Sequence, residues 1–312
     1  MACKKCLEKP VIKLPNSNIS LCKSCYIKYF EKKVKRTISE YNLIEKNDHI
    51  VIAVSGGKDS TTLLYLIKKI TKERRDIKIT ALAIDEGIHD YRDKSLKFLK
   101  NFCKEHKIEL KIFSYKEEFG KSLDEIMKTY KGISCSICGV LRRYLLNKKS
   151  REFKATKLAT GHNLDDEAQS ILMNFFRKNI KVSARLGPIT GIISDKRFVK
   201  RIKPLYMLTE KEVTAYAYLK GFMDKFVECP YSSEAYRNQV RNMLNDFELK
   251  YPGTKQSIIA SFLEILPLLK QHYKNMPTEI KSCSLCEEPC SQEVCKTCQY
   301  IENMIKPRNK PL

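Results

Sequence analysis

The sequence predicts an α/β fold: a doubly wound, mostly parallel sheet with a small cysteine-rich unit at each end of the chain. Three observations carry this prediction. Short apolar runs alternate with helical patterns through the middle of the chain. A glycine-rich loop follows the first apolar run. Paired cysteines are concentrated near both termini.

Composition and charge narrow the class of protein. The chain has 312 residues, of which 43% are hydrophobic and 30% charged, as in ordinary globular proteins. Lys and Arg number 59 against 36 Asp and Glu, a net charge of +23 that favours a polyanionic partner. No apolar run reaches the roughly 18 residues of a membrane span. The N-terminus has no apolar signal core, so we expect a cytoplasmic protein with no membrane contact.

The elements follow from the period of the apolar residues. Five short apolar runs predict strands, beginning at His49 and then at 78–88, 108–115, 156–163 and 201–206. Apolar residues at a spacing of three to four predict helices at 26–44, 58–73, 91–107, 122–130, 140–153, 164–178, 209–222, 234–250 and 255–274. Thr209, with Glu212 three residues later, predicts a capped helix start. Pro267 is expected to kink or end the last helix.

Eight cysteines form two terminal knuckles, each predicted to close a four-sulfur zinc site. The first has the spacing C-x2-C-x15-C-x2-C and the second C-x2-C-x8-C-x2-C. Their residues are Cys3, Cys6, Cys22 and Cys25, and Cys283, Cys286, Cys295 and Cys298. Redox-active C-x2-C pairs are the alternative. Each segment is too short to build a core, so metal would stabilise its fold. We therefore divide the chain into zinc units at 1–30 and 281–312 around a domain at 31–280.

Two further cysteines receive structural interpretations. Cys103 lies on the apolar side of a predicted helix, which indicates a buried thiol. Cys290 lies inside the second knuckle, as a bystander or as a substitute for Cys295.

The last three cysteines are a candidate reactive group. Cys135 and Cys138 face the same way on a predicted helix start, and Cys229 precedes Pro230 in a loop or extended segment. Three converging thiolates can ligate iron. Iron–sulfur cubanes normally take four ligands, so three would leave one iron open. A disulfide and persulfide relay, a third zinc site and unrelated buried thiols are the alternatives.

Residues 55–60 read SGGKDS and lie between an apolar strand and an amphipathic helix. The two glycines let backbone amides approach an anion, and the helix start adds its dipole. The serines add hydroxyl groups and the lysine adds charge. The pattern differs from the Walker A loop, and an ordinary glycine turn is the alternative.

Three motifs resemble those of the PP-loop ATP pyrophosphatases, which release pyrophosphate and adenylate a carbonyl oxygen. They are SGGKDS, IDEGI at 84–88 and TGHNLDDEAQ at 160–169. The resemblance implies a Rossmann-like sheet with ATP at the carboxyl ends of the strands. It implies nucleotide and Mg²⁺ contacts from Ala53, Ser55, Gly56, Gly57, Lys58, Asp59, Ser60, Ile84, Gly161 and Asp166.

Some of these acidic residues have structural alternatives. Asp85 is also suited to cap the end of a strand. Asp165 and Asp166 both suit a helix N-terminus, where negative charge is favoured. We expect one of the two to cap the helix and the other to face the phosphates.

The knuckles, the loop and the central cysteines together resemble the tRNA 2-thiouridine synthetases of the TtcA/TtuA group, closest to the TtuA/NcsA branch, over essentially the full chain. The resemblance implies ATP-dependent replacement of a uridine C2 oxygen by sulfur. It implies a [4Fe-4S] or [3Fe-4S] cluster on Cys135, Cys138 and Cys229, two Zn²⁺ ions, and a homodimer. Sulfur would come from a ubiquitin-like thiocarboxylate carrier or from free sulfide. Both wobble and T-loop uridines are substrates in relatives.

Arg142 departs from the family pattern, because relatives often carry a catalytic lysine at this position. Arginine stays protonated and cannot shuttle a proton near neutral pH, although it can stabilise oxygen charge. Two basic stretches at 177–185 and 195–203, with Arg237 and Arg241 one helical turn apart, fit contacts to tRNA phosphates.

Two rival functions stay open at this point. The first is another PP-loop enzyme, modifying tRNA or forming an amide, that needs no iron and no cysteine trio. The second is a zinc-knuckle RNA-binding protein whose ATP site is vestigial. The intact SGGKDS and LDDEAQ motifs argue against the second.

Overall fold

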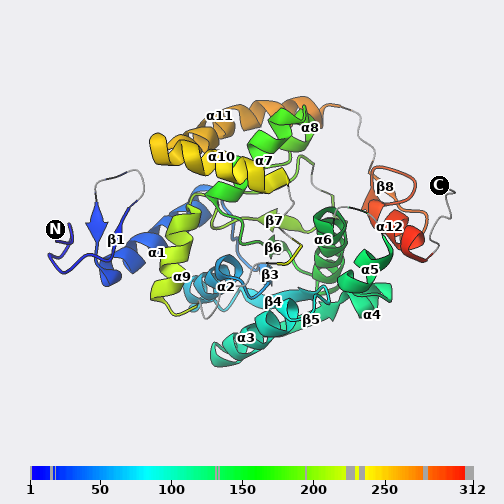
Figure 1. Ribbon diagram of the computed structural model, residues 1–312, viewed down its shortest axis with the longest axis horizontal. Coiled ribbons are helices and arrows are strands. Elements are labelled where there is room, and N and C mark those ends of the chain that lie inside the picture. Colours follow the sequence, from blue (N-terminus) through cyan, green and yellow to red (C-terminus); the bar gives the residue numbers. More distant parts are fainter. Residues whose placement is uncertain are drawn as a thin grey trace.

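The computed structural model describes residues 2–14, 17, 19–130, 132, 134–193, 195–222, 229–231, 236–276 and 280–305. At its centre is a five-stranded parallel sheet in the order β5-β4-β3-β6-β7 (Figure 1). The strands are β3 His49–Ala53, β4 Lys78–Asp85, β5 Leu110–Ser114, β6 Lys157–Ala159 and β7 Lys200–Ile202. The predicted α/β fold with a mostly parallel sheet is therefore confirmed. Successive strands move outward on one side of β3 and then on the other, so the topological switch lies between β3 and β6.

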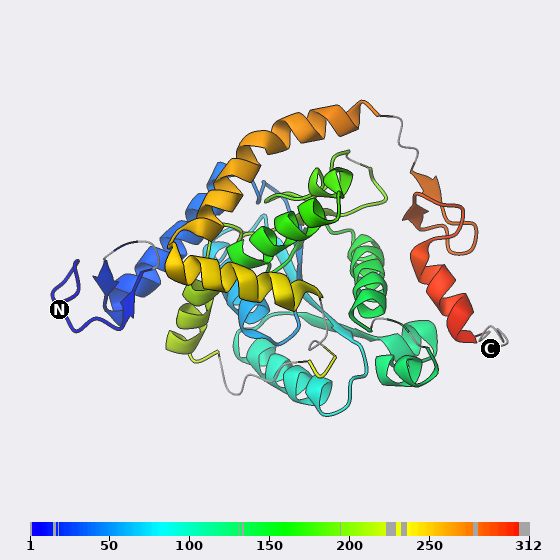
Figure 2. The ribbon, with the colours of Figure 1, turned by 45° about the horizontal axis from the view of Figure 1, so that its top comes forward.

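The nine predicted helices are present with shifted ends. They are α1 Lys23–Glu40, α2 Lys58–Ile70, α3 Tyr91–Glu105, α5 Leu123–Thr129, α6 Ser134–Glu152, α7 Leu164–Phe176, α9 Glu210–Leu219, α10 Tyr236–Lys250 and α11 Thr254–Lys274. The described residues form three further helices that the sequence did not predict, α4 Tyr115–Phe119, α8 Ile180–Ser183 and α12 Lys296–Ile305. The cap of α9 is confirmed, since Thr209 Oγ1 accepts from the Glu212 amide at 3.2 Å. The last long helix continues through Pro267 to Lys274, so the proline does not end it, and it curves over the molecule (Figure 2).

Helices cover both faces of the sheet because alternate strand side chains point to opposite sides. Ile50 and Ile52 of β3 belong to a buried cluster shared with α1, α2, α3 and α9. Val51, between them, belongs to a second cluster shared with α5 and α6. A third cluster joins α7, α10 and α11 around Phe262. Cys103 of α3 is 3% exposed, which confirms its prediction as a buried thiol.

The two knuckles lie at opposite ends of the molecule (Figure 1). Each contains a two-stranded hairpin: β1 Ile12–Lys13 with β2 Ser20–Leu21, and β8 Lys281–Ser282 with β9 Pro289–Cys290. Helix α1 starts inside the first knuckle and continues across the predicted boundary at 30/31 into the central domain. Helix α12 starts inside the second knuckle and packs on α6. Among the described residues, no helix is both long and apolar enough to span a bilayer.

Candidate functional site

The loop at 55–60 joins β3 to α2 at the carboxyl edge of the sheet, and a ring of hydrogen bonds holds it. Ser60 Oγ accepts from the Ser55 amide at 3.1 Å and donates to the Gly57 carbonyl at 3.1 Å. The two serine hydroxyl oxygens lie 3.2 Å apart. The SGGKDS segment is thus a preformed loop whose shape depends on both serines.

Two glycines lie where backbone segments approach each other. Gly56 has a φ of +82°, and a Cβ there would lie 2.6 Å from the Ser95 carbonyl oxygen. Gly161, after β6, lies tightly against the same loop, since a Cβ there would lie 3.1 Å from the amide nitrogen of Ser60 and push that backbone by a few tenths of an ångström. The first and third predicted motifs therefore meet at the switch point between β3 and β6.

Lys58 and Asp59 form an ion pair at the start of α2. Lys58 Nζ lies 2.8 Å from Asp59 Oδ2 and 3.2 Å from Glu210 Oε1. Burial lowers the pKa of Lys58, but the two carboxylates raise it by more than burial lowers it. The net shift is upward, so the amine stays charged. Asn163 Nδ2 donates to Asp59 Oδ1 at 3.2 Å and ties the loop to the start of α7.

The two neighbouring acids of α7 have different surroundings. Asp165 is buried, pairs with Lys255 and accepts from the Glu210 amide at 2.7 Å. Asp166 completes a capping box, because its Oδ2 accepts from the amide of Asn163 at 3.1 Å. Burial raises the pKa of Asp166 to about 6, and the charge of Asp59 adds to the shift. Asp166 therefore caps α7 and is also acted on by the charge of Asp59.

Arg92 is a buried residue of this site that the sequence reasoning missed. Its guanidinium group donates to the Ser55 carbonyl at 2.7 Å and to the Ile84 carbonyl, and Nε lies 2.8 Å from Glu86 Oε2. Ile84, expected to contact the nucleotide, thus has its backbone carbonyl bonded to Arg92. An arginine early in a helix after an acidic strand end is the only local signal.

Two other predicted positions lie beside the loop. Ala53 is the last residue of β3 and is half-buried. Asp85 ends β4, where its Oδ1 accepts from the Gly87 amide at 2.9 Å. The strand-end capping alternative for Asp85 is therefore confirmed.

The structure brings the segments of the three central cysteines together. Cys135 and Cys138 lie in the first turns of α6, which starts six residues earlier than the predicted helix. Cys135 Sγ donates to the Tyr231 carbonyl at 3.2 Å, two residues from Cys229. Burial raises the pKa of the Cys138 and Cys229 thiols. The charge of Cys229 adds to the shift of Cys138, and that of Cys135 adds to the shift of Cys229.

The spacing of this trio tests the third-zinc alternative. Its three sulfur atoms do not all lie within 4.8 Å of one another, in contrast to those of each knuckle. With zinc–sulfur bonds of about 2.3 Å, ligands of one ion cannot be further apart than about 4.6 Å. A group with several irons can be reached from more widely spaced thiolates, each on its own metal. The three sulfur atoms therefore do not form a closed group of the kind that the knuckles form.

Glu86 links the loop and the cysteines. One carboxylate oxygen contacts Arg92, which holds the loop carbonyls, and the other lies 3.5 Å from Nη1 of Arg142. Arg142 lies one helical turn after Cys138. Tyr115, which sequence reasoning also missed, donates to the Cys138 carbonyl at 2.8 Å and lies 3.7 Å from its sulfur.

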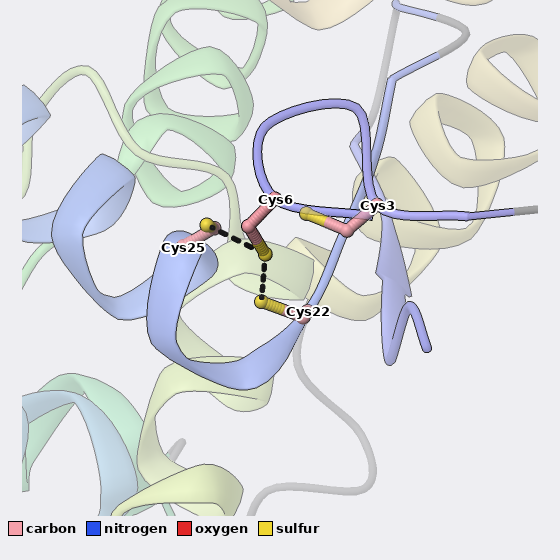
Figure 3. Close-up of side chains that lie close together, drawn as sticks. All are labelled: Cys3, Cys6, Cys22 and Cys25. Carbon is pink, nitrogen blue, oxygen red and sulfur yellow. Dashed lines mark hydrogen bonds between the residues drawn. The ribbon is translucent and has the colours of Figure 1, made fainter. Parts of the chain in front are cut away.

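The terminal knuckles converge as their spacing predicts. The four sulfur atoms of each lie within 4.8 Å of one another. In the first, Cys6 Sγ lies 3.3 Å from Cys22 Sγ and 3.5 Å from Cys25 Sγ (Figure 3). Cys290 lies outside the second group and donates to the Gln292 carbonyl at 2.8 Å. Each group is suited to one tetrahedral metal ion with no open position.

Backbone amides prepare one thiolate in each knuckle. Burial raises the pKa of Cys3, but hydrogen bonds from the amides of Cys22, Lys5 and Cys6 outweigh it and lower the value to about 6. Cys283 has the same arrangement and a pKa lowered to about 6. Thiolates are the form that binds metal, so both groups are biased toward a cation.

Comparison with known families assigns both parts of the chain. A family described as "PP-loop domain" matches residues 27–247, and one described as "2-thiouridine synthetase TtuA, N-terminal LIM domain" matches residues 3–27. The chain belongs to the TtuA/NcsA family of PP-loop proteins. The second match covers the first knuckle, including all four of its cysteines.

Individual relatives extend this family assignment over nearly the whole chain. The tRNA-5-methyluridine(54) 2-sulfurtransferase of Pyrococcus horikoshii is 38% identical over 96% of this chain and 93% of its own. The cytoplasmic tRNA 2-thiolation protein 1 of Danio rerio is 37% identical over 97% and 88%. The structure of the U34-tRNA thiolase NcsA of Methanococcus maripaludis, with its [4Fe-4S] cluster, has a TM-score of 0.81 and 34% identity over 97% and 96%. The protein is therefore a sulfurtransferase with a PP-loop domain, and the family predicted from the sequence is confirmed.

Proposed function

We propose that this protein is an ATP-dependent tRNA 2-thiouridine synthetase. The C2 oxygen of a uridine attacks the α-phosphate of ATP and pyrophosphate leaves. Sulfur then attacks C2, and AMP leaves with the original oxygen. The observation that supports this most strongly is the connection through Glu86, which joins the PP-loop, by Arg92, to Arg142 beside the cysteines. Both halves of the reaction need to act on one base.

The adenylation half depends on the loop and its neighbours. Amides of Gly56 and Gly57, with the N-terminus of α2, are suited to bind the phosphates. Ser55 and Ser60 shape the loop, and Lys58 brings positive charge to the leaving pyrophosphate. Asp59 and Asp166, whose charges interact, would hold Mg²⁺. Ala53, Ile84 and Gly161 border the nucleotide at the strand ends.

The sulfur half depends on the cysteine trio. Cys135, Cys138 and Cys229 would hold an iron–sulfur cluster, which when bound offers an iron without a protein ligand to inorganic sulfur. Arg142, always protonated, is placed to stabilise negative charge on the departing phosphate oxygen or on sulfur. The sulfur source is a carrier thiocarboxylate or free sulfide. The other two metal sites, the knuckles, would each hold one Zn²⁺ and have no catalytic part.

The wider setting follows the relatives. We propose a tRNA substrate and a cytoplasmic location, in line with the charge of +23 and the names of the relatives. The homodimer stays a proposal from the family resemblance alone. The relative from Pyrococcus is named for position 54 and the one from Methanococcus for U34. Assays therefore need tRNA substrates in which each position can be followed separately.

The test is an anaerobic thiolation assay with reconstituted protein, ATP, Mg²⁺, sulfide and unmodified tRNA. We expect 2-thiouridine by nucleoside analysis, with one AMP and one pyrophosphate formed per sulfur inserted. As a control, Cys290→Ser should leave this activity unchanged, because the Cys290 thiol lies outside both knuckle groups and the trio. ATP consumption without thiolated nucleoside at either position would overturn the proposal in favour of an iron-free PP-loop enzyme.

A further inference from the structure

Four arginines on three elements form a group in which like charges interact. Arg142 and Arg143 come from α6, Arg201 from β7, and Arg237 from α10. Their charges act on one another: Arg143 is in the field of Arg142 and Arg237, and Arg201 is in the field of Arg143. Helices α6 and α10 and strand β7, which are distant in sequence, thus bring positive charges close to one another.

Acidic side chains compensate this group incompletely. Arg142 Nη1 lies 3.5 Å from Glu86, and Arg237 Nη1 lies 3.8 Å from Asp166. Within the described parts of the chain, neither Arg143 nor Arg201 has a carboxylate oxygen within 4.0 Å. The group therefore carries more positive charge than its carboxylate partners balance.

Arg201 adds a second sign of an unfilled site. Its Nε is buried and has no hydrogen-bond partner among the described residues. The nearby acid Glu167 is engaged by Lys203, whose Nζ lies 2.7 Å from it. Desolvation, followed by the charge of Arg143, lowers the pKa of Arg201, yet a guanidinium group does not lose its proton in proteins. An anion is the partner that would relieve both the repulsion and the unmet donor.

The position of the group identifies which anion fits. Arg142 follows Cys138 by one helical turn, whereas Arg237 donates to the Asp166 carbonyl at 3.4 Å and to Ser170 Oγ at 3.1 Å. The group therefore spans from the cysteines to the acid nearest the loop. A uridine that meets ATP first and sulfur second has to lie along this span, with its flanking phosphates beside it.

We propose that Arg142, Arg143, Arg201 and Arg237 form a phosphate-binding site for the tRNA backbone next to the target uridine. This inference rests on the proposed function and adds the element that holds the nucleotide. Arginine suits the task because its planar fork binds phosphate oxygens in pairs. Arg143 is exposed and so accessible to RNA, and Arg201 belongs to the basic stretch at 195–203.

The experiment measures tRNA binding without ATP or sulfide, at several salt concentrations, with anaerobically reconstituted protein. Variants are Arg143→Gln, at an exposed position that tolerates change, and Arg201→Gln. Arg36→Gln is the control, since its side chain is 82% exposed on α1 and carries the same charge. Each site variant is expected to weaken binding about five- to tenfold and to reduce the salt slope by about 1. Arg201→Lys should restore part of the affinity.

These measurements distinguish binding of tRNA phosphates from binding of ATP or pyrophosphate, and they test this inference separately from the proposed function. Unchanged affinity and slope in both site variants would overturn the inference. A loss of ATP affinity or of pyrophosphate inhibition, with tRNA binding intact, would also overturn it and assign the arginines to the leaving pyrophosphate. A wild-type protein that makes no 2-thiouridine contradicts the proposed function alone. Weakened binding in the site variants with a silent Arg36→Gln would still support the phosphate site.

Discussion

The knuckles and the central trio use the same side chain in opposite ways. In each knuckle four sulfur atoms come from a short stretch of chain and lie within 4.8 Å of one another. In the trio, α6 and the segment at Pro230 bring three sulfur atoms into one region without closing them around a point. A closed set leaves no position for a reactant, whereas an incomplete and spread set does.

The surroundings of the thiols reinforce this contrast only in part. Backbone amides lower the pKa of Cys3 and Cys283 to about 6, so the knuckles are prepared for a metal by their own turns. Burial instead raises the pKa of Cys138 and Cys229. The pKa values of Cys6, Cys25, Cys295 and Cys298 are raised as well, so only one thiolate in each knuckle is prepared by its turn. The closed arrangement of four sulfur atoms, rather than the pKa of the thiols, therefore separates the knuckles from the trio.

The largest expected effect comes from breaking the trio alone. Cys135→Ala and Cys229→Ala should each lose the cluster iron and reduce thiolation at least about 100-fold, because a two-cysteine site cannot retain the cluster. Zinc should stay at about two ions per chain, and ATP affinity should change less than about twofold. Metal analysis, acid-labile sulfide and nucleoside analysis measure these quantities. Retained thiolation, or joint loss of zinc and iron, would contradict the separation of the two kinds of site.

The second prediction compares how much each knuckle contributes to the stability of the protein. Cys22 of the first knuckle is buried in the main cluster with Leu21 and Tyr26, whereas Cys295 belongs to a small cluster made of its own knuckle. Helix α1 also stacks Phe30 on Tyr216, with ring centroids 4.3 Å apart. Loss of the first zinc should therefore disturb the central core more than loss of the second, whose knuckle reaches the core through α12 packed on α6.

The paired variants are Cys22→Ser and Cys295→Ser. Each should lose about one zinc, but the first should lower Tm by about 10 °C and the second by less than half as much. Thermal unfolding followed by circular dichroism measures both. Equal shifts would mean that the second knuckle supports the core as strongly as the first.

A third prediction concerns the glycines of the PP-loop. Gly56→Ala places a Cβ 2.6 Å from a backbone oxygen and should raise the KM for ATP at least about tenfold, because the loop has to move. Gly120→Ala is the matched control, since Gly120 shares a positive φ of +77° but has nothing within 4 Å of an added Cβ. It should reduce stability slightly and leave ATP binding unchanged. Equal losses in the two variants would point to backbone strain rather than loop geometry.

A fourth prediction is a pH dependence at Asp166. Its pKa is raised to about 6, so the carboxyl group holds a proton below that pH and loses it above. Mg²⁺-dependent ATP binding should weaken as the pH falls from 7 to 5, by up to about tenfold per pH unit. Ionisation of this buried group costs folding stability above pH 6, so Asp166→Asn should not destabilise the protein there. Its ATP affinity should be low and independent of pH, which titration calorimetry can measure.

Local sequence patterns predicted most of the fold and part of the candidate site. The period of the apolar residues located the strands and helices, and the cysteine spacing alone predicted both knuckle groups. Strands β6 and β7, of three residues each, are shorter than the predicted 156–163 and 201–206. Arg92, Glu86 and Tyr115 escaped prediction since their roles arise from contacts between distant segments. The spacing of residues within one helix does not predict that a buried arginine will donate to the carbonyls of two other segments.

The smallest effect tests whether Tyr115 belongs to the reactive site. Tyr115→Phe removes the hydroxyl that contacts the carbonyl and sulfur of Cys138, at a stability cost of about 1 kcal/mol. Hydrogen bonds to ligating sulfur raise the potential of a cluster, so its midpoint potential should fall by tens of millivolts. Tyr144→Phe is the matched change at the second knuckle, where the hydroxyl faces Cys286. Zinc has no redox chemistry, so that variant should leave the potential unchanged. A shift of equal size in both variants would show that α6 as a whole, which carries both Cys138 and Tyr144, had moved.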